Sequence, residues 1–344
     1  MDLHSIKLRL QEHLSDGLVL IIGSGLSCAE GLPGMQQLAD YLREQLAGEF
    51  TGTDADTWAA ISELLDKNGL EAALLKIPPT PNIESALVKC IGEKISDYER
   101  TAISELFSGK RTLKLTRLLK YIVKPKTGLP IITTNYDRLI EIAVEEAGLG
   151  ADTMFFGRFI GKLNKKESAF SFCRNAKLTK KNCCLEKIDR ALIYKPHGSL
   201  DWYSRNGTPV FYAGDLPNCT RLIITPGKNK YRNGYERPFD LHLSCANDAI
   251  DKASRFLVIG YGFNDDHLQT HLISRIENGK PILILTRSLS KNARQLALEY
   301  RNVISIEQMS NSSGTCIIFE QKEYSFPSIE IWDVDSFVKE VLEP

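Results

Sequence analysis

The chain has 344 residues, of which 43% are hydrophobic and 25% are charged, values that are ordinary for a globular protein. Its 43 basic and 43 acidic residues balance, so the overall charge does not favour nucleic acid as a direct partner. No apolar run approaches the ~18 residues of a membrane-spanning helix, and the N-terminal residues do not resemble a signal peptide. We therefore expect a cytoplasmic protein with no membrane partner.

The first predicted strand leads into a glycine-rich turn. A short amphipathic helix at 6–14 precedes the apolar run 17–22, which suits a parallel strand covered on both faces. The turn 23–27, Gly-Ser-Gly-Leu-Ser, allows close approach of a bound group, and free N–H groups there favour an anion such as a nucleotide phosphate. Because Cys28 replaces the third glycine of the dinucleotide fingerprint, a simple turn remains an alternative at this point.

About a hundred residues of mainly helical pattern separate this strand from the next one. The predicted helices are 36–46, 57–65, 70–75, 83–95 and 113–122. A dehydrogenase-type βαβ unit returns to its sheet within ~30 residues. The spacing therefore argues against an ordinary dehydrogenase and predicts an inserted helical module over 50–125.

The remainder of the chain alternates between strands and helices. The predicted strands are 129–133, 191–194, 222–224, 256–259, 281–285 and 303–305, and the predicted helices are 139–144, 239–253, 265–276, 290–299 and 334–342. This alternation predicts an α/β fold with a Rossmann-like, doubly wound parallel sheet. We expect one domain over 1–344.

A basic surface insertion is predicted over 156–190. Residues 158–190 hold ten Lys and Arg against three Asp and Glu, with weak hydrophobic periodicity. A solvated basic loop and a partner-binding or nucleic-acid-binding patch are both compatible with this composition.

The eight cysteines include no C-x-x-C pair, which disfavours both a zinc ribbon and a disulfide framework. His267 and His271 are four residues apart on one predicted helix, but no third metal ligand is evident beside them. We therefore expect no metal.

Polar or glycine-rich clusters follow four of the predicted strands. They are 23–27, 133–137 (Thr-Thr-Asn-Tyr-Asp), 197–199 (His-Gly-Ser) and 260–265 (Gly-Tyr-Gly-Phe-Asn-Asp). Each alone could cap a helix or form a turn. Ligands of open parallel sheets bind outside the carboxyl ends of the strands, so four such clusters together predict a binding site.

In this order the clusters resemble the motifs of the sirtuin superfamily. The turn 23–27 resembles its Gly-Ala-Gly-x-Ser loop, 134–137 its Gln-Asn-Ile-Asp motif, 197–198 its catalytic His-Gly and 260–263 its Gly-x-Ser loop. The zinc cysteines of the deacetylases are missing. The residue sequences of the last three clusters resemble those of the sirtuin-like proteins of bacterial antiphage defence, which hydrolyse NAD. A chain of this size resembles the subunit that pairs with a HerA-type hexameric ATPase.

The resemblance implies NAD as substrate and assigns roles to particular residues. The implied catalytic residues are Asn135, His197 and Asp137, and the implied NAD-binding residues are Gly23, Ser24, Gly25, Ser27, Thr134, Gly260, Gly262, Phe263 and Thr286. Asn135 would orient the ribose or water and His197 would act as a base. The implied function is an NAD+ glycohydrolase of abortive infection.

The resemblance also implies partners. The chain is expected to form a homo-oligomer and a complex with the HerA-type ATPase. It is expected to contact nucleic acid only indirectly. Two alternatives stay open: an NAD- or ADP-ribose-sensing subunit without turnover, and an NAD-dependent deacylase or ADP-ribosyltransferase.

Overall fold

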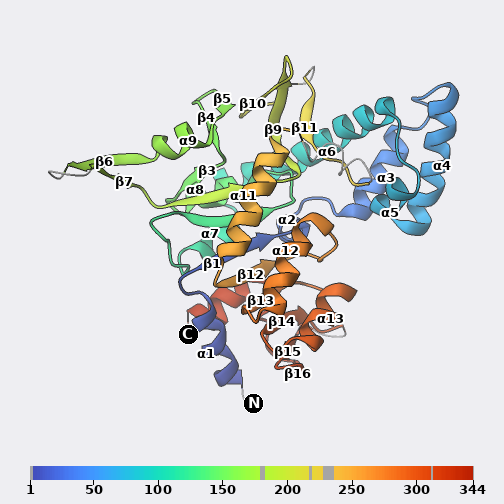
Figure 1. The fold of residues 1–344 in the computed structure, drawn as a ribbon. Coiled ribbons are helices and arrows are strands. Elements are labelled where there is room, and N and C mark those ends of the chain that lie inside the picture. Colours follow the sequence, from blue (N-terminus) through green and yellow to red (C-terminus); the bar gives the residue numbers. More distant parts are fainter. Residues whose placement is uncertain (1–2, 179–182, 217–218, 228–235, 311–312, 344) are drawn as a thin grey trace.

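A nine-stranded sheet in the order β16-β15-β14-β13-β12-β1-β2-β8-β3 forms the centre of the computed structural model (Figure 1). The structure describes residues 3–178, 183–216, 219–227, 236–310 and 313–343. The strands from β14 to β3 are parallel, and β15 and β16 add an antiparallel edge. The predicted α/β fold with a parallel-dominated sheet is therefore confirmed. The strands are β1 (Leu18–Ile22), β2 (Leu129–Thr133), β3 (Gly150–Asp152), β8 (Arg190–Tyr194), β12 (Arg255–Ile259), β13 (Ile282–Leu285), β14 (Val303–Gln308), β15 (Thr315–Phe319) and β16 (Lys322–Phe326).

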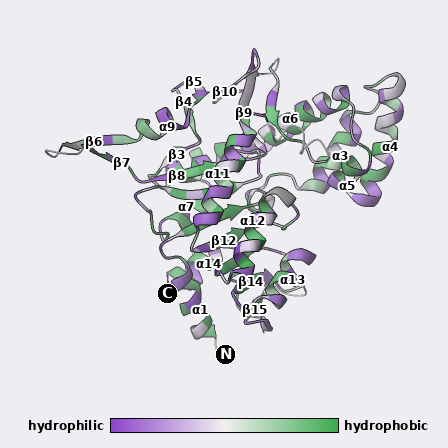
Figure 2. Cartoon of the chain, viewed as in Figure 1, coloured by the Kyte–Doolittle hydropathy of each residue, from purple (hydrophilic) through white to green (hydrophobic). Residues whose placement is uncertain are grey.

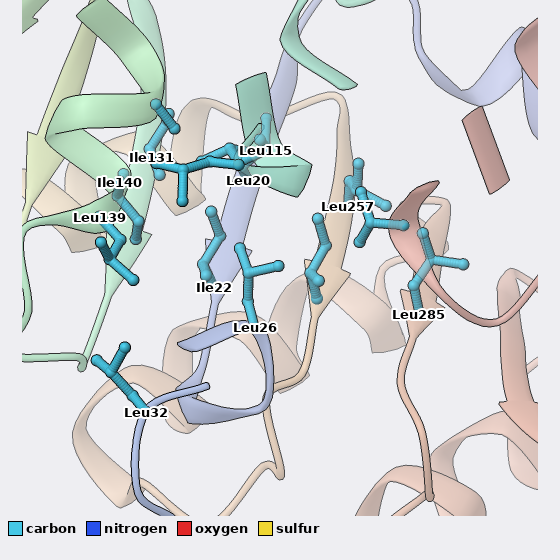
Figure 3. Close-up of a cluster of buried hydrophobic side chains, with 14 of the residues drawn as sticks. Leu20, Ile22, Leu26, Leu32, Leu115, Ile131, Leu139, Ile140, Leu257 and Leu285 are labelled. Carbon is cyan, nitrogen blue, oxygen red and sulfur yellow. The ribbon is translucent and has the colours of Figure 1, made fainter. Parts of the chain in front are cut away.

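Both faces of this sheet are covered, as the continuous apolar strands predict. Leu20 and Ile22 of β1 point to one face and pack with Leu257 of β12 and with helices α7 and α8 (Figure 3). Val19 and Ile21 point to the other face, under α11, α12 and α13. Figure 2 shows the hydrophobic colouring on central strands such as β12. The core thus consists of two apolar layers, one on each side of the sheet.

The covering helices match the predicted ones closely. They are α1 (Leu3–His13), α7 (Lys114–Leu119), α8 (Leu139–Glu146), α11 (Phe239–Lys252), α12 (Asp266–Glu277), α13 (Lys291–Glu299) and α14 (Val334–Phe337), which continues as the helical turn η1 (Val338–Leu342). No helix in the described ranges combines the length and apolarity that crossing a membrane requires.

Helices fill the interval between β1 and β2 and extend to one side of the sheet (Figure 1). Thr80 caps the longest helix by accepting from the N–H of Ile83 at 3.4 Å, and Pro81 occupies its first turn. This helix continues well beyond the predicted 83–95. The helices are α2 (Ser24–Ala29), α3 (Met35–Gln45), α4 (Gly52–Asn68), α5 (Leu70–Lys76) and α6 (Pro81–Phe107).

A second, antiparallel sheet of five strands, in the order β11-β9-β10-β5-β4, was not predicted. Its strands are β4 (Phe155–Phe156), β5 (Ile160–Leu163), β9 (Gly198–Arg205), β10 (Thr208–Tyr212) and β11 (Arg221–Ile223). The strand predicted at 222–224 lies in this sheet rather than in the parallel one, paired antiparallel with β9. A short apolar run does not specify its partner strand, which explains the error.

The predicted basic insertion is more regular than its weak periodicity indicates. It contains β5, helix α9 (Lys165–Ser171) and a hairpin of β6 (Cys173–Leu178) and β7 (Cys183–Lys187) that projects from the body (Figure 1). Its residues 179–182 lie outside the described residues.

Candidate functional site

A cavity of about 260 Å³ lies at the carboxyl ends of β1, β2 and β12. Its lining comes from the turn after β1, the loop 134–137 after β2, His197, and the segment 260–265 after β12. Residues of α3, α5 and α6 close one side. Three of the four predicted clusters and the histidine of the fourth thus meet at one place, where parallel sheets bind their ligands.

A larger cavity of about 730 Å³ lies elsewhere, between α6 and the region 215–223. None of the predicted site residues lines it. Of its charged side chains, Arg100 and Arg221 both pair with Asp215. The smaller cavity holds the convergent polar groups and is the better candidate.

The glycines of the turn are required by a close contact between two backbone segments. The N–H groups of Gly23 and Gly25 donate to the carbonyls of Ile259 and Gly260, at 2.9 and 3.0 Å. A Cβ on Gly25 would lie 2.7 Å from Cα of Gly260, and Gly260 has φ +58°. These two amides are therefore engaged by the protein, unlike the free donors that the sequence suggests.

Asn135, Ser27 and Asp137 form one hydrogen-bonded chain. Asn135 Nδ2 donates to the carbonyl of Gly23 at 2.9 Å and to Ser27 Oγ at 2.8 Å. Ser27 Oγ donates to Asp137 Oδ2 at 2.7 Å, and Asp137 Oδ1 accepts from the N–H of Leu139 at 3.2 Å. Since a carbonyl only accepts, Gly23 fixes the amide orientation and leaves Asn135 Oδ1 as an acceptor at the cavity.

Asp137 is a buried carboxyl group with an altered acidity. Burial raises its pKa to about 6, while the Lys195 ammonium and the hydrogen bond from Ser27 lower it. Both of its oxygens accept hydrogen bonds from the protein, so Asp137 also anchors the start of α8.

Lys195 fixes the loop after β2 through hydrogen bonds of its ammonium group. Its side chain is fully buried, and its ammonium donates to the carbonyl of Asp137 at 2.5 Å and to Glu141 Oε1 at 3.0 Å. On the same loop, the hydroxyl of Tyr136 donates to the carbonyl of Ile224 at 2.6 Å. These contacts fix the backbone that presents Asn135.

His197 faces a carboxylate. Its Nε2 lies 2.7 Å from Asp265 Oδ2, and both side chains are buried. The residue after it, Gly198, has φ +89°, and a Cβ there would lie 2.0 Å from the carbonyl oxygen of Leu222. Asp265 is thereby placed to orient the imidazole ring of His197 at the cavity.

Nine of the predicted residues line the cavity and three do not. Those that line it are Gly23, Ser24, Ser27, Thr134, Asn135, Asp137, His197, Gly260 and Gly262. Gly25 is taken up by the backbone contact with Gly260. Phe263 is fully buried, with φ +54° and its ring 5.3 Å from that of Tyr261. The Thr286 hydroxyl donates to the carbonyl of Ser288 at 3.1 Å.

Sequence reasoning missed two of the polar groups that act on the site. Asp265 lies within a recognised cluster, but nothing in its spacing indicates His197 as its partner. Lys195 precedes a proline in an otherwise apolar setting, and an unpaired lysine is rare inside a protein. That setting is the signal that could have marked Lys195 as a buried, paired cation.

Within the described ranges, no group of three or more His, Cys, Asp or Glu side chains is placed to hold a metal ion. His271 instead contacts Asp251, at 3.0 Å. The side chain of His267 lies outside the described residues. The described residues therefore include no zinc site like that of the sirtuin deacetylases.

The family model described as a SIR2-like domain matches residues 130–306. No curated protein sequence matches the chain. The match covers just over half of the chain, and it includes Asn135, His197 and Asp265 but not the turn after β1.

Similar solved structures include sirtuins. One, from a study of sirtuin substrate affinity, is 13% identical over 100% of this chain and 99% of its own, with a TM-score of 0.44. Sir2 with a p53 peptide and NAD+ is 14% identical over 100% and 98%, with a TM-score of 0.40. A Sir2 homologue in complex with NAD is 12% identical over 83% and 84%, with a TM-score of 0.38. Because these TM-scores are low, the structural similarity is not used to assign a family. The family match over residues 130–306 is sufficient, and the chain belongs to the SIR2-like domain family.

Proposed function

We propose that the chain is an NAD+ glycohydrolase, which cleaves NAD+ with water to nicotinamide and ADP-ribose. The observation that carries the proposal is that His197, paired with Asp265, lines the same strand-end cavity as Asn135. Membership of the SIR2-like family supplies NAD+ as the substrate to test.

The reaction breaks the bond between C1′ of the ribose and the nicotinamide nitrogen. The bonding electrons move to the nitrogen, which neutralises the pyridinium, so the leaving group needs no proton. The ribose develops oxocarbenium character, water attacks C1′, and one proton is released. A base near C1′ and an acceptor that orients the water or a ribose hydroxyl are what this reaction requires.

The described contacts suit these roles. Asn135 Oδ1 accepts from the water or a ribose hydroxyl, because both N–H groups of the amide are engaged with Gly23 and Ser27. His197 takes the proton, and Asp265 stabilises the resulting imidazolium. Asp137 accepts from the nicotinamide carboxamide while its hydrogen bond from Ser27 keeps it in place.

The remaining proposed contacts hold the dinucleotide. Ser24, Thr134 and the stretch 260–262 line the cavity where the pyrophosphate and ribose would lie. Gly25 shapes the turn. Phe263 and Thr286 stay proposals for the adenosine side, and neither is among the residues that line the cavity.

The decisive experiment measures NAD+ consumption by the purified chain and identifies the products by chromatography. We expect nicotinamide and ADP-ribose in equal amounts, and at least a ~10²-fold loss of rate in His197→Ala and in Asn135→Ala. Matched controls are His271→Ala and Asn278→Ala, two side chains outside the cavity lining. Normal turnover by both site variants would refute the assignment.

Other outcomes separate the alternative functions. A product that forms only with an acylated peptide or an acceptor protein would indicate a deacylase or an ADP-ribosyltransferase. Tight NAD+ binding without turnover, with and without a HerA-type ATPase, would indicate a sensor. The antiphage role, NAD+ depletion on infection, the homo-oligomer and the ATPase partner rest on the sequence resemblance. The test of these is phage plating on cells that carry the chain with and without the ATPase.

A further inference from the structure

His242 is a fully buried histidine to which the proposed reaction gives no role. It lies on α11, which covers one face of the sheet (Figure 1). Burial lowers the pKa of His242 to about 3, and the Lys195 ammonium lowers it further, so the ring is neutral. Its Nδ1 lies 3.1 Å from the backbone nitrogen of Lys195. Because a backbone N–H only donates, Nδ1 is the acceptor, and the ring proton is on Nε2.

The surroundings of this ring are aromatic. Its centroid lies 4.5 Å from that of Trp202 and 6.5 Å from that of Phe155. Within the part of the chain that the structure describes, Nε2 of His242 has no hydrogen-bond partner. Burying a polar ring among aromatic side chains is costly unless the ring is hydrogen-bonded. The bond from Lys195 is therefore the contact that accounts for a histidine at this position.

Lys195 begins the tight turn that carries His197. The N–H of Gly198 donates to the carbonyl of Lys195 at 3.0 Å and closes the turn 195–198. Pro196 stands at the second position of this turn, where its ring fixes φ, and His197 stands at the third. Lys195 directly follows the last residue of β8. Its N–H thus lies at the junction of strand and turn, and whatever holds that N–H sets the direction in which the chain leaves the sheet.

The bond to His242 is one of three anchors of this turn. The N–H of Ile224 donates to the carbonyl of His197 at 2.9 Å, and the Lys195 ammonium binds the loop after β2. Only the bond to His242 connects the backbone of Lys195 to α11. Lys195 is fully buried, so its N–H would lack a partner without this acceptor, and a buried N–H without a partner is unfavourable. Loss of the acceptor therefore favours a shift of the turn.

We propose that His242 is a positioning residue of the site. Its Nδ1 holds the N–H of Lys195, fixes the turn 195–198 and thereby keeps His197 against Asp265 at the cavity. His242 acts through His197, since it is not among the residues that line the cavity. This role deepens the proposed NAD+ hydrolysis and rests on it for the rate measurement, whereas the hydrogen bond is tested without NAD+.

The test compares two substitutions at position 242 with a matched control. His242→Leu keeps the bulk of the side chain and removes the acceptor. His242→Asn is smaller but keeps an acceptor, because Oδ1 of asparagine occupies about the place of Nδ1. The control is His13→Leu. His13 is also buried, and its Nε2 lies 2.7 Å from the carbonyl of Phe256, near the amino end of β12 and away from the strand ends that form the site. Thermal unfolding gives the stability of each variant.

The first measurement is hydrogen exchange at the Lys195 amide by NMR. We expect slow exchange in the wild type and in His242→Asn, and at least ~10-fold faster exchange in His242→Leu, whose Lys195 N–H has lost its acceptor. Equal exchange in the two position-242 variants would overturn the proposal, whatever their activity.

The second measurement is the steady-state kinetics of NAD+ hydrolysis. We expect about a 10²-fold lower kcat in His242→Leu, the loss that a misplacement of about 1 Å can cause. KM should change little, because His242 does not line the cavity. His242→Asn should retain most of the wild-type kcat although it loses more packing, and His13→Leu should retain it as well. A merely structural role predicts the reverse order of the two position-242 variants, because activity would then follow stability.

A kcat of His242→Leu equal to that of the wild type, or equal losses in His242→Leu and His242→Asn, would also overturn the proposal. If the wild type shows no turnover, the hydrolase assignment fails, and crystal structures of the two variants decide the role of His242. A contact between His197 and Asp265 that stays near 2.7 Å in His242→Asn and lengthens in His242→Leu would support it. An unchanged contact in both variants would refute it.

Discussion

Asp137 allows the site to be tested through stability alone, without any assumption about the substrate. Burial raises its pKa from 3.8 to about 6, so the folded chain binds this proton more tightly than the unfolded chain does. The stabilisation from this proton is complete below pH 3.8 and is lost as the pH rises through about 6. Replacing Asp137 with Asn removes the titration and keeps the size of the side chain.

The expected magnitude follows from the two pKa values. Between about pH 5 and about pH 7.5, Asp137 lowers the free energy of unfolding of the wild type by about 1.4 kcal/mol. Other buried carboxyl groups, such as Glu141 and Asp201, also have raised pKa values because of burial. They titrate in both proteins, so the difference between wild type and Asp137→Asn isolates the one residue.

The assay is urea unfolding of both proteins at the two pH values, with equal urea dependence as the check on two-state behaviour. We expect Asp137→Asn to gain about 1.4 kcal/mol relative to wild type on going from about pH 5 to about pH 7.5. A difference between the two proteins that is the same at both pH values would show that this carboxyl is not perturbed and would refute the reasoning.

Three further changes probe the site. Asp265→Asn removes the carboxylate beside His197, and we expect about a 10²-fold lower rate of NAD+ hydrolysis; a rate equal to that of the wild type would count against the pair. The new Cβ of Gly260→Ala would lie 2.6 to 2.8 Å from backbone atoms at a positive φ, so this variant should lose about 2–5 kcal/mol of unfolding free energy. The control Gly279→Ala, at a positive φ in open space, should lose about 1 kcal/mol. Equal losses in the two variants would contradict the close contact. Lys195→Met leaves a buried carboxylate unpaired and should lower stability by about 3–5 kcal/mol by urea unfolding, and a variant as stable as wild type would exclude the buried pair.

The hydrophobic periodicity and the alternation of strands and helices along the chain were predictable because they are local properties. The run at β1 is apolar at every position, so it required cover on both faces, and Val19 and Ile21 do point away from Leu20 and Ile22. The four clusters could be placed near one another because parallel strands end at one edge of the sheet.

Pairings between distant residues were not predictable from the sequence. The glycine turn was expected to offer free amides to an anion, but Gly23 and Gly25 donate to the carbonyls after β12. Ser27 lines the cavity as predicted, but the sequence did not indicate that its hydroxyl bridges Asn135 and Asp137. A hydrogen-bonding group binds whichever partner the packing brings within reach, and residue spacing alone does not contain that information.

By itself, the sequence determined the alternation of strands and helices, the inserted helices, the charge of the basic insertion and the residues with candidate chemistry. Composition and periodicity are properties of neighbouring residues. Only the tertiary structure decided that β11 pairs with β9 in a second sheet, that Asp265 faces His197 and that Lys195 supports the loop of Asn135. Those contacts join residues far apart in the chain, and their distances and directions depend on how the sheet, its loops and the surrounding helices pack.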